Sequence, residues 1–163
     1  TLGDAGLGLD TLQGKMDVPP KHRNFVANRL NYPTPRVLVG TMLRRIASSC
    51  IDISDGLIAD LRHIMQASNC GAILQVEKIP LSEAMRDSVA GEQALRYALT
   101  AGDDYELLFS VSEEQKGNLD LAMTTASVSV TCIGQLNGVQ GKLELRDGKE
   151  RYAFEGQGYQ HFS

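Results

Sequence analysis

The sequence lacks the features that mark nucleic-acid-binding and membrane-spanning proteins. Its 163 residues carry 16 Lys and Arg against 20 Asp and Glu, a net charge of −4. That balance gives no reason to expect nucleic acid or an anionic membrane surface as a partner. No apolar run approaches the roughly 20 residues that a membrane span needs, and no secretory signal is visible.

Cysteine is scarce, and its spacing disfavours disulfides and zinc. The three cysteines are far apart and lack a C-x-x-C pattern: Cys50, Cys70 and Cys132. Their odd number and apolar or strand-like surroundings predict buried thiols in a reducing, cytoplasmic location. None of the three histidines is spaced as a metal ligand with another His or Cys.

Two common catalytic motifs are also absent. Lys15 follows Gly14, but the full phosphate-binding pattern G-x-x-x-x-G-K-[ST] does not occur. No serine lies in a G-x-S-x-G nucleophile elbow. The sequence therefore gives no support to a P-loop enzyme or a serine hydrolase.

Strand-like and helical segments alternate along most of the chain. Apolar patterns predict strands over four ranges: 50–54, 72–79, 105–111 and 128–132. Helical spacing lies between them, and residues 142–154 have the pattern of a hairpin. This order predicts an α/β fold, an α+β sandwich in which a mixed β-sheet is covered by helices. A chain of this length suits one domain with its own core, so we expect residues 1–163 to form a single domain.

The strongest candidate for a ligand site is the segment CIDISDGL at residues 50–57. A predicted strand ends there and a helix begins, which is where α/β proteins tend to gather ligand-binding groups. The carboxylates of Asp52 and Asp55 and the hydroxyl of Ser54 collect at this point. Carboxylates so close repel each other unless a cation such as Mg²⁺ offsets their charge. The alternative is structural: Ser54 or Asp55 is the helix N-cap, and Asp52 is a solvated strand residue.

A second acidic cluster, GDDYE at residues 102–106, precedes another predicted strand. As structure alone it is a turn with a solvated acidic patch. As a site, it offers a carboxylate that accepts hydrogen bonds from an amine or a ring N–H of a small ligand. Residues 156–162 are rich in glycine and aromatic side chains. There Tyr159 either anchors the tail to the core or offers a flat face on which a ring can stack.

Three motifs together resemble the C-terminal half of the thiamine-monophosphate kinase family. They are IDISDGL at 51–57, GDDYEL at 102–107 and GYQHF at 158–162, in matching order and spacing over nearly the whole chain. The resemblance implies the aminoimidazole-ribonucleotide-synthetase-like superfamily, with this chain as a C-terminal domain. It also implies an N-terminal domain outside this sequence, which makes the parent protein a homodimer and supplies most ligands of ATP and magnesium. The chain begins with Thr1 rather than methionine, which agrees with that expectation.

The resemblance implies roles at the matching positions. Asp52 and Asp55 would bind magnesium, and Ser54 would contact ATP. Asp103 and Tyr159 would contact thiamine monophosphate. The family usually has glutamate where Asp103 stands, so this side chain is one methylene shorter; a shifted loop or a bridging water would restore the contact. The implied reaction is phosphoryl transfer from ATP to thiamine monophosphate, giving thiamine diphosphate and ADP.

Two alternatives stay open beside this interpretation. A sibling enzyme of the superfamily, making aminoimidazole ribonucleotide or selenophosphate, would share the fold and the use of ATP. The isolated chain would instead be a non-catalytic binding module, because it has no Gly-rich loop to cradle a triphosphate. We therefore expect a kinase in the parent protein and little or no activity from this chain alone.

Overall fold

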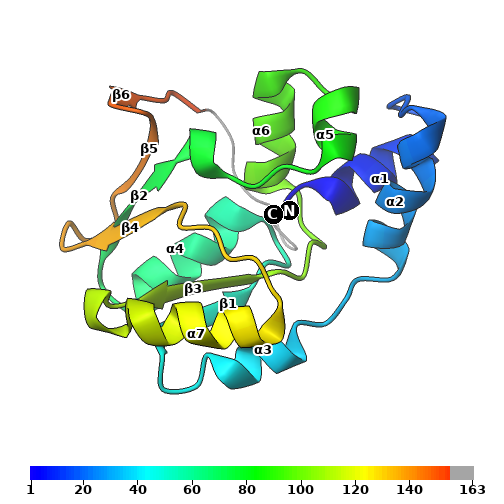
Figure 1. The fold of residues 1–163 in the computed structure, drawn as a ribbon. Coiled ribbons are helices and arrows are strands. Elements are labelled where there is room, and N and C mark those ends of the chain that lie inside the picture. The colour runs from blue at the N-terminus through cyan, green and yellow to red at the C-terminus, as the bar shows by residue number, and fades with distance from the viewer. Residues whose placement is uncertain (155–163) are drawn as a thin grey trace.

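The computed structural model describes residues 1–154 (Figure 1). Its helices are α1 (Asp4–Leu12), α2 (Pro20–Asn31), α3 (Val37–Met42), α4 (Leu57–Ala67), α5 (Glu83–Ser88), α6 (Gly91–Thr100) and α7 (Lys116–Ala126). Its strands are β1 (Ala47–Asp52), β2 (Gly71–Gln75), β3 (Leu107–Val111), β4 (Gly134–Asn137), β5 (Leu143–Asp147) and β6 (Glu150–Arg151). The expected mixed α/β class is confirmed. None of the helices in this range has the length and apolar character to cross a bilayer.

Within the described range the strands form two sheets. β1 and β3 pair antiparallel, with Asp52 opposite Leu107. The second sheet has the order β4-β2-β5-β6, in which β2 pairs parallel with β5 and antiparallel with β4. Parallel and antiparallel pairs therefore coexist, and β5 and β6 form the expected terminal hairpin.

Two of the predicted strands are shorter than expected, each for a local reason. β2 ends at Gln75 because the chain tightens into a 3₁₀ turn over Val76–Lys78. β3 begins at Leu107 rather than Tyr105, since Tyr105 has a φ of 49°. An extended strand needs a negative φ, so the backbone at Tyr105 belongs to the preceding loop.

The strand predicted over residues 128–132 is wrong, and these residues form a connecting segment instead. The amide of Val128 donates to the carbonyl of Met123 at 3.1 Å and closes the end of α7. The Val128 side chain packs against the buried cluster of Val39 and Met123 between α3 and α7. Only Val128 of the alternating residues is packed in this way, since Val130 and Cys132 are exposed, and the next strand, β4, begins at Gly134.

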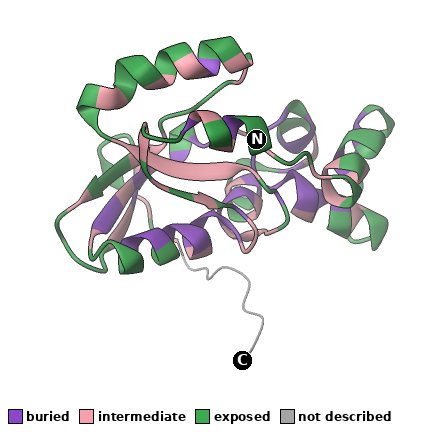
Figure 2. Ribbon diagram, turned by 90° about the horizontal axis from the view of Figure 1, so that it is seen from below, coloured by how far each residue is buried: buried purple, intermediate pink, exposed green. Residues whose placement is uncertain are grey.

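Buried side chains hold the elements together, and Figure 2 marks in purple where buried residues fall along the ribbon. The largest cluster joins α4 and α6 to β2 and β5, with Leu57, Leu74 and Leu99 among its members. A second cluster joins α1 and α2 to α5 around Leu7 and Met85. These two clusters fix the ends of β1 and β3 relative to α1 and α2, and the candidate site lies at those ends.

The expectation of buried thiols is wrong for two of the three cysteines. Cys50 and Cys132 are exposed, and Cys70 is half-buried. Residues of β1 alternate between half-buried and exposed positions, so Cys50 lies on the same outward face as Asp52. The alternation predicted the strand correctly, but the polar face of that strand includes the cysteine.

Candidate active site

The first acidic segment lies where the sequence placed it, between a strand and a helix. Asp52 ends β1 and is exposed, whereas the next residue, Ile53, is buried beside Leu57 at the start of α4. Ser54 and Asp55 occupy the short loop between them and are half-buried. The predicted order of strand, acidic loop and helix is confirmed.

The second acidic segment is hydrogen-bonded directly to the first. The amide of Asp103 donates to the carbonyl of Ser54 at 2.9 Å, and the amide of Tyr105 donates to the carbonyl of Ile53 at 2.8 Å. The amide of Ile53 in turn donates to the carbonyl of Glu106 at 2.8 Å. These bonds continue the β1–β3 pairing beyond the strands, so the two acidic loops form one backbone unit.

Two glycines allow the loops to approach this closely. A Cβ atom added to Gly102 would overlap the carbonyl oxygen of Ser54. Gly56 has a φ of 105°, and a Cβ there would lie 2.8 Å from the backbone of Thr100. Glycine is therefore required at both positions, once for a close approach and once for a left-handed backbone.

The hydroxyl of Tyr105 contacts one carboxylate of the two loops and lies within electrostatic range of two more. That hydroxyl donates to Oδ1 of Asp103 at 3.2 Å. The hydrogen bond raises the pKa of Tyr105, and the nearby negative charges of Asp103, Asp52 and Asp55 raise it further. We call Asp52, Asp55 and Asp103 the acidic edge. Among residues 1–154, no lysine or arginine forms an ion pair with Asp52 or Asp103, so the acidic edge favours a cation or a hydrogen-bond donor.

The N-cap interpretation of Ser54 and Asp55 is wrong. The N-cap of α4 is Gly56, and no side chain caps the helix there. Instead Asp60, in the first turn of α4, reaches back and accepts hydrogen bonds from the amides of Ser54 at 3.0 Å and Asp55 at 3.1 Å. Burial raises the pKa of Asp60, and these two hydrogen bonds oppose the rise. Asp60 thus shapes the loop, and the hydroxyl of Ser54 is not used as a helix cap.

The donor set fits a hard divalent cation. Mg²⁺ prefers carboxylate oxygens and keeps several water ligands, so one or two carboxylates suffice. Ligand atoms of Asp55, Asp60 and the exposed His63 lie within 4.8 Å of one another, although Asp60 already accepts two backbone hydrogen bonds. This cluster includes Asp55 but not Asp52, so magnesium binding by Asp52 and Asp55 stays a prediction from the sequence.

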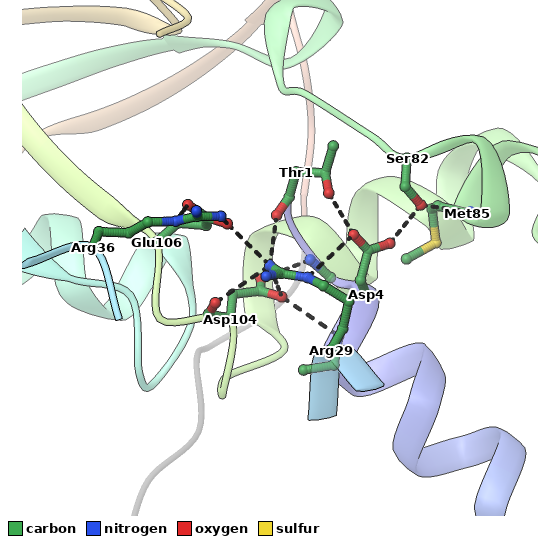
Figure 3. Close-up of polar contacts among 10 residues, drawn as sticks. Thr1, Asp4, Arg29, Arg36, Ser82, Met85, Asp104 and Glu106 are labelled. Carbon is green, nitrogen blue, oxygen red and sulfur yellow. Dashed lines mark hydrogen bonds and ion pairs between the residues drawn. The ribbon is translucent and has the colours of Figure 1, made fainter. Parts of the chain in front are cut away.

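A second set of charged residues lies behind the acidic edge, inside the fold (Figure 3). We call it the buried charge network: Asp4, Arg29, Arg36, Asp104 and Glu106. Arg29 of α2 is central, with Nη2 3.2 Å from Glu106 and 3.9 Å from the carboxylate of Asp104, and with Nε 3.8 Å from Asp4. Arg36 makes a two-pronged contact with Glu106, at 2.9 and 2.7 Å.

The surroundings of this network shift several pKa values. Burial raises the pKa of Asp104 to about 7, and the amide of Gly3 and the charge of Arg29 limit the rise. Burial also acts to raise the pKa of Glu106, but the hydrogen bonds from Arg36 and the surrounding positive charges, among them Arg36 and Arg29, together outweigh it and the pKa is lowered. The sequence analysis did not identify this network, because no spacing in the sequence shows that α1, α2 and the 102–106 loop meet.

Four of the predicted site residues fall within the described range. Three of them lie at the acidic edge: Asp52, Asp55 and Asp103. Ser54 lies in the same loop unit. Tyr159 lies outside the described residues. The structure adds Tyr105 and Asp60, whose contacts hold the two loops in shape. Tyr105 stands in the quoted GDDYE segment, so its position in sequence was visible, whereas its contact with Asp103 was not.

Comparison with known proteins agrees with this geometry. No protein-family model matches the chain. Over its whole length the chain is 44% identical to the thiamine-monophosphate kinase of Escherichia coli strain K12, and it covers 50% of that protein. The fold aligns with the crystal structure of thiamine-monophosphate kinase from Stenotrophomonas maltophilia K279a at a TM-score of 0.82 and 35% identity, over 89% of this chain and 47% of that one.

A second solved structure, AaThiL complexed with AMPPCP and TMP, aligns at a TM-score of 0.80 and 30% identity. The match covers 99% of this chain and 49% of that chain. The chain thus spans about half the length of the relatives that it matches. Sequence identity over the whole chain and a shared fold lead to one conclusion: the chain belongs to the thiamine-monophosphate kinase family.

Proposed function

We propose that this chain is the C-terminal domain of a kinase that transfers a phosphoryl group from ATP to thiamine monophosphate, giving thiamine diphosphate and ADP. The observation that carries the proposal is the hydrogen-bonded pairing of the two acidic loops, which gathers the acidic edge in one place. The substrate class is supported by family membership and by the AaThiL structure, which was solved with AMPPCP and TMP. The remainder of the site and a homodimer contact belong, in this proposal, to an N-terminal domain, and the enzyme acts in the cytoplasm.

The residues of this chain divide the work between the two loops. Asp52 and Asp55 hold Mg²⁺, and the hydroxyl of Ser54 donates a hydrogen bond to ATP. Bound magnesium would offset the negative charge that builds up when two phosphates approach each other. Asp103 contacts thiamine monophosphate and is oriented by the hydroxyl of Tyr105.

The chemistry needs little more than this from the protein. The accepting oxygen belongs to a phosphate and is already ionised, so no strong general base is required. Phosphoryl transfer depends mainly on positioning and on neutralised charge. Carboxylates held by a rigid backbone unit supply the positioning, and the magnesium that they would hold would neutralise the charge. Tyr159, which lies outside the described residues, would complete the substrate pocket.

The experiment that tests the proposal measures thiamine diphosphate formation by the full-length protein from thiamine monophosphate and magnesium-ATP. We expect product, and we expect none when the substrate is replaced by those of the aminoimidazole-ribonucleotide or selenophosphate reactions. A folded protein that forms no thiamine diphosphate would overturn the assignment. Turnover with a sibling substrate would move the protein to that reaction while leaving the fold assignment intact.

A further inference from the structure

Asp104 belongs to the second acidic segment, residues 102–106, which we call the substrate loop. It lies between two exposed residues, but its own side chain faces the opposite way. Asp103 and Tyr105 are exposed and have positive φ angles of 64° and 49°. Asp104 is 1% exposed. A left-handed backbone costs a residue with a side chain roughly 1 kcal/mol or more, so it persists only where the surroundings hold it. One such residue stands on each side of Asp104, which indicates that Asp104 is the point at which the loop is held.

The carboxylate of Asp104 binds the start of α1. Its Oδ2 accepts a hydrogen bond from the amide of Gly3 at 2.6 Å, and its Oδ1 lies 3.5 Å from the amide of Ala5. Gly3 is the N-cap of α1 and has no side chain with which to cap the helix itself. Asp104 therefore serves as the missing cap, from a position far away in the sequence, and its charge suits a helix N-terminus.

A second helix holds the same residue through its backbone. Nη2 of Arg29, in α2, donates to the main-chain carbonyl of Asp104 at 3.3 Å and lies 3.9 Å from its carboxylate. On the other side, the amides of Asp103 and Tyr105 are bound by the carbonyls of the first acidic loop. Residues 103–105 are thus held by α1 and α2 on one side and by the first acidic loop on the other.

We propose that Asp104 is a positioning residue for substrate binding: by capping α1, it holds Asp103 and Tyr105 in the left-handed conformation that presents the Asp103 carboxylate to the substrate. The inference rests on the proposed function, in which Asp103 contacts thiamine monophosphate. Asp104 touches neither substrate nor metal in this account and acts only through its neighbours.

Asp4 provides a matched control. It is as deeply buried as Asp104, at 0% exposure, and it pairs with the same arginine, Arg29. Its carboxylate, however, accepts hydrogen bonds from Ser82 and Thr1 rather than from the substrate loop, and it acts on Asp104 only through its charge. A purely stabilising role would make substitutions at Asp4 and Asp104 equivalent, whereas a positioning role would separate them.

The test compares the Asp104→Ala, Asp104→Asn and Asp4→Asn variants of the full-length protein. We expect Asp104→Ala to raise the KM for thiamine monophosphate about tenfold, the effect of one lost hydrogen bond to a charged group, with kcat and the KM for ATP nearly unchanged. Asp104→Asn keeps one oxygen that can accept from the Gly3 amide, so its KM should rise less. Asp4→Asn should leave the KM for thiamine monophosphate unchanged.

Hydrogen exchange of the amides in residues 102–107 gives a second measurement that does not depend on activity. The amides of Asp103 and Tyr105 should exchange faster in Asp104→Ala and at the wild-type rate in Asp4→Asn. An unchanged KM and unchanged exchange in a folded Asp104 variant, or equal effects at Asp4, would overturn the inference. A wild-type protein without thiamine diphosphate formation would refute the proposed function instead, and exchange would then decide whether Asp104 holds the loop.

Discussion

The acidic edge and the buried charge network are built from neighbouring residues but meet opposite surroundings. The acidic edge is exposed or half-buried, and in the described range neither Asp52 nor Asp103 pairs with a lysine or arginine. Every carboxylate of the buried network lies within 4 Å of an arginine nitrogen. Adjacent residues, Asp103 and Asp104, belong to different groups. The difference teaches that charge alone does not mark a ligand site; whether a carboxylate such as Asp52 or Asp103 is paired with a lysine or arginine is more informative.

The two groups also differ in what their charges cost the fold. Buried ions are tolerated only when they are paired and hydrogen-bonded, so the buried network is expected to be intolerant of any missing member. Exposed carboxylates keep much of their hydration, so their substitution should affect ligand chemistry more than folding. Four predictions test this contrast.

The largest effect is expected from Arg29→Met, which removes the central cation of the buried network. Three carboxylates would lose a partner, and a broken buried ion pair typically costs about 3–5 kcal/mol of unfolding free energy. Chemical denaturation followed by circular dichroism measures the loss. The control is Lys116→Met, which removes an exposed pair with Glu113 and should change stability much less. Equal losses in the two variants would mean that burial does not distinguish the pairs.

The next effect falls on catalysis rather than stability. Asp52→Asn or Asp55→Asn in the full-length protein should lower turnover at least ~100-fold, the scale of a lost electrostatic contact in the transition state. Unfolding free energy should change little for the exposed Asp52. The exposed Asp120 on α7 offers a control, since Asp120→Asn should keep wild-type turnover. Near-normal turnover of the Asp52 and Asp55 variants at saturating magnesium would remove the metal-ligand role.

A smaller change in stability is expected where the two loops touch. Gly102→Ala would drive a methyl group into the carbonyl oxygen of Ser54, and overpacking of this kind costs about 1–3 kcal/mol. Gly117, in α7, has open space around its Cβ position, so Gly117→Ala should be neutral or slightly stabilising. Thermal unfolding of both variants measures the difference. A Gly102→Ala variant as stable as wild type would show that the loops can separate at little cost.

The last effect is a slope in the pH dependence of stability. Burial raises the pKa of Asp104 from 3.8 to about 7, so the folded protein binds this proton more tightly than the unfolded chain does. The stabilising contribution of the Asp104 carboxyl to the unfolding free energy is therefore fully present below about pH 4. It is lost as the pH rises to about 7, and the stability does not change further above that on account of this group. The charges of Arg29 and Asp4 also act on this carboxylate, and both residues are present in the two proteins that are compared.

The measurement is the unfolding free energy of wild type minus that of Asp104→Asn, across pH 4 to 8. Because the variant cannot titrate at this position, the difference should fall with rising pH, by at most about 1.4 kcal/mol per pH unit, and then level off. Parallel stability curves for the two proteins would show that Asp104 titrates as an exposed aspartate does.

Local patterns were enough to locate both acidic loops, because each depends on short-range features. The alternation over residues 50–54 and the Gly56 that follows it are visible in the sequence and predict the strand, loop and helix, although the strand itself ends at Asp52. The N-cap expectation failed because Asp60, inside the helix, took the loop amides instead. A capping pattern does not reveal a hydrogen-bond acceptor that lies four or more residues beyond the amides for which it competes.

Long-range contacts could not be predicted from the sequence for a related reason. The pairing of β1 with β3 joins segments that are more than 50 residues apart, and no pattern within either strand specifies its partner. The opposite orientations of Asp103 and Asp104 depend on two left-handed residues and on contacts with α1 and α2. The valines near residue 130 show the converse, since their period of two occurs in a connecting segment in which Val128 packs against a buried cluster and Val130 is exposed.

The backbone hydrogen bonds between the two acidic loops carry a practical consequence for engineering. Because the amides of Asp103 and Tyr105 bind the carbonyls of Ser54 and Ile53, neither loop has a shape of its own that could be transplanted. An attempt to alter substrate choice by exchanging one loop with that of a homologue would mismatch the other. Residues 52–56 and 101–106 should therefore be grafted together as a cassette, and insertions in either one should be tolerated only with a matching change in its partner.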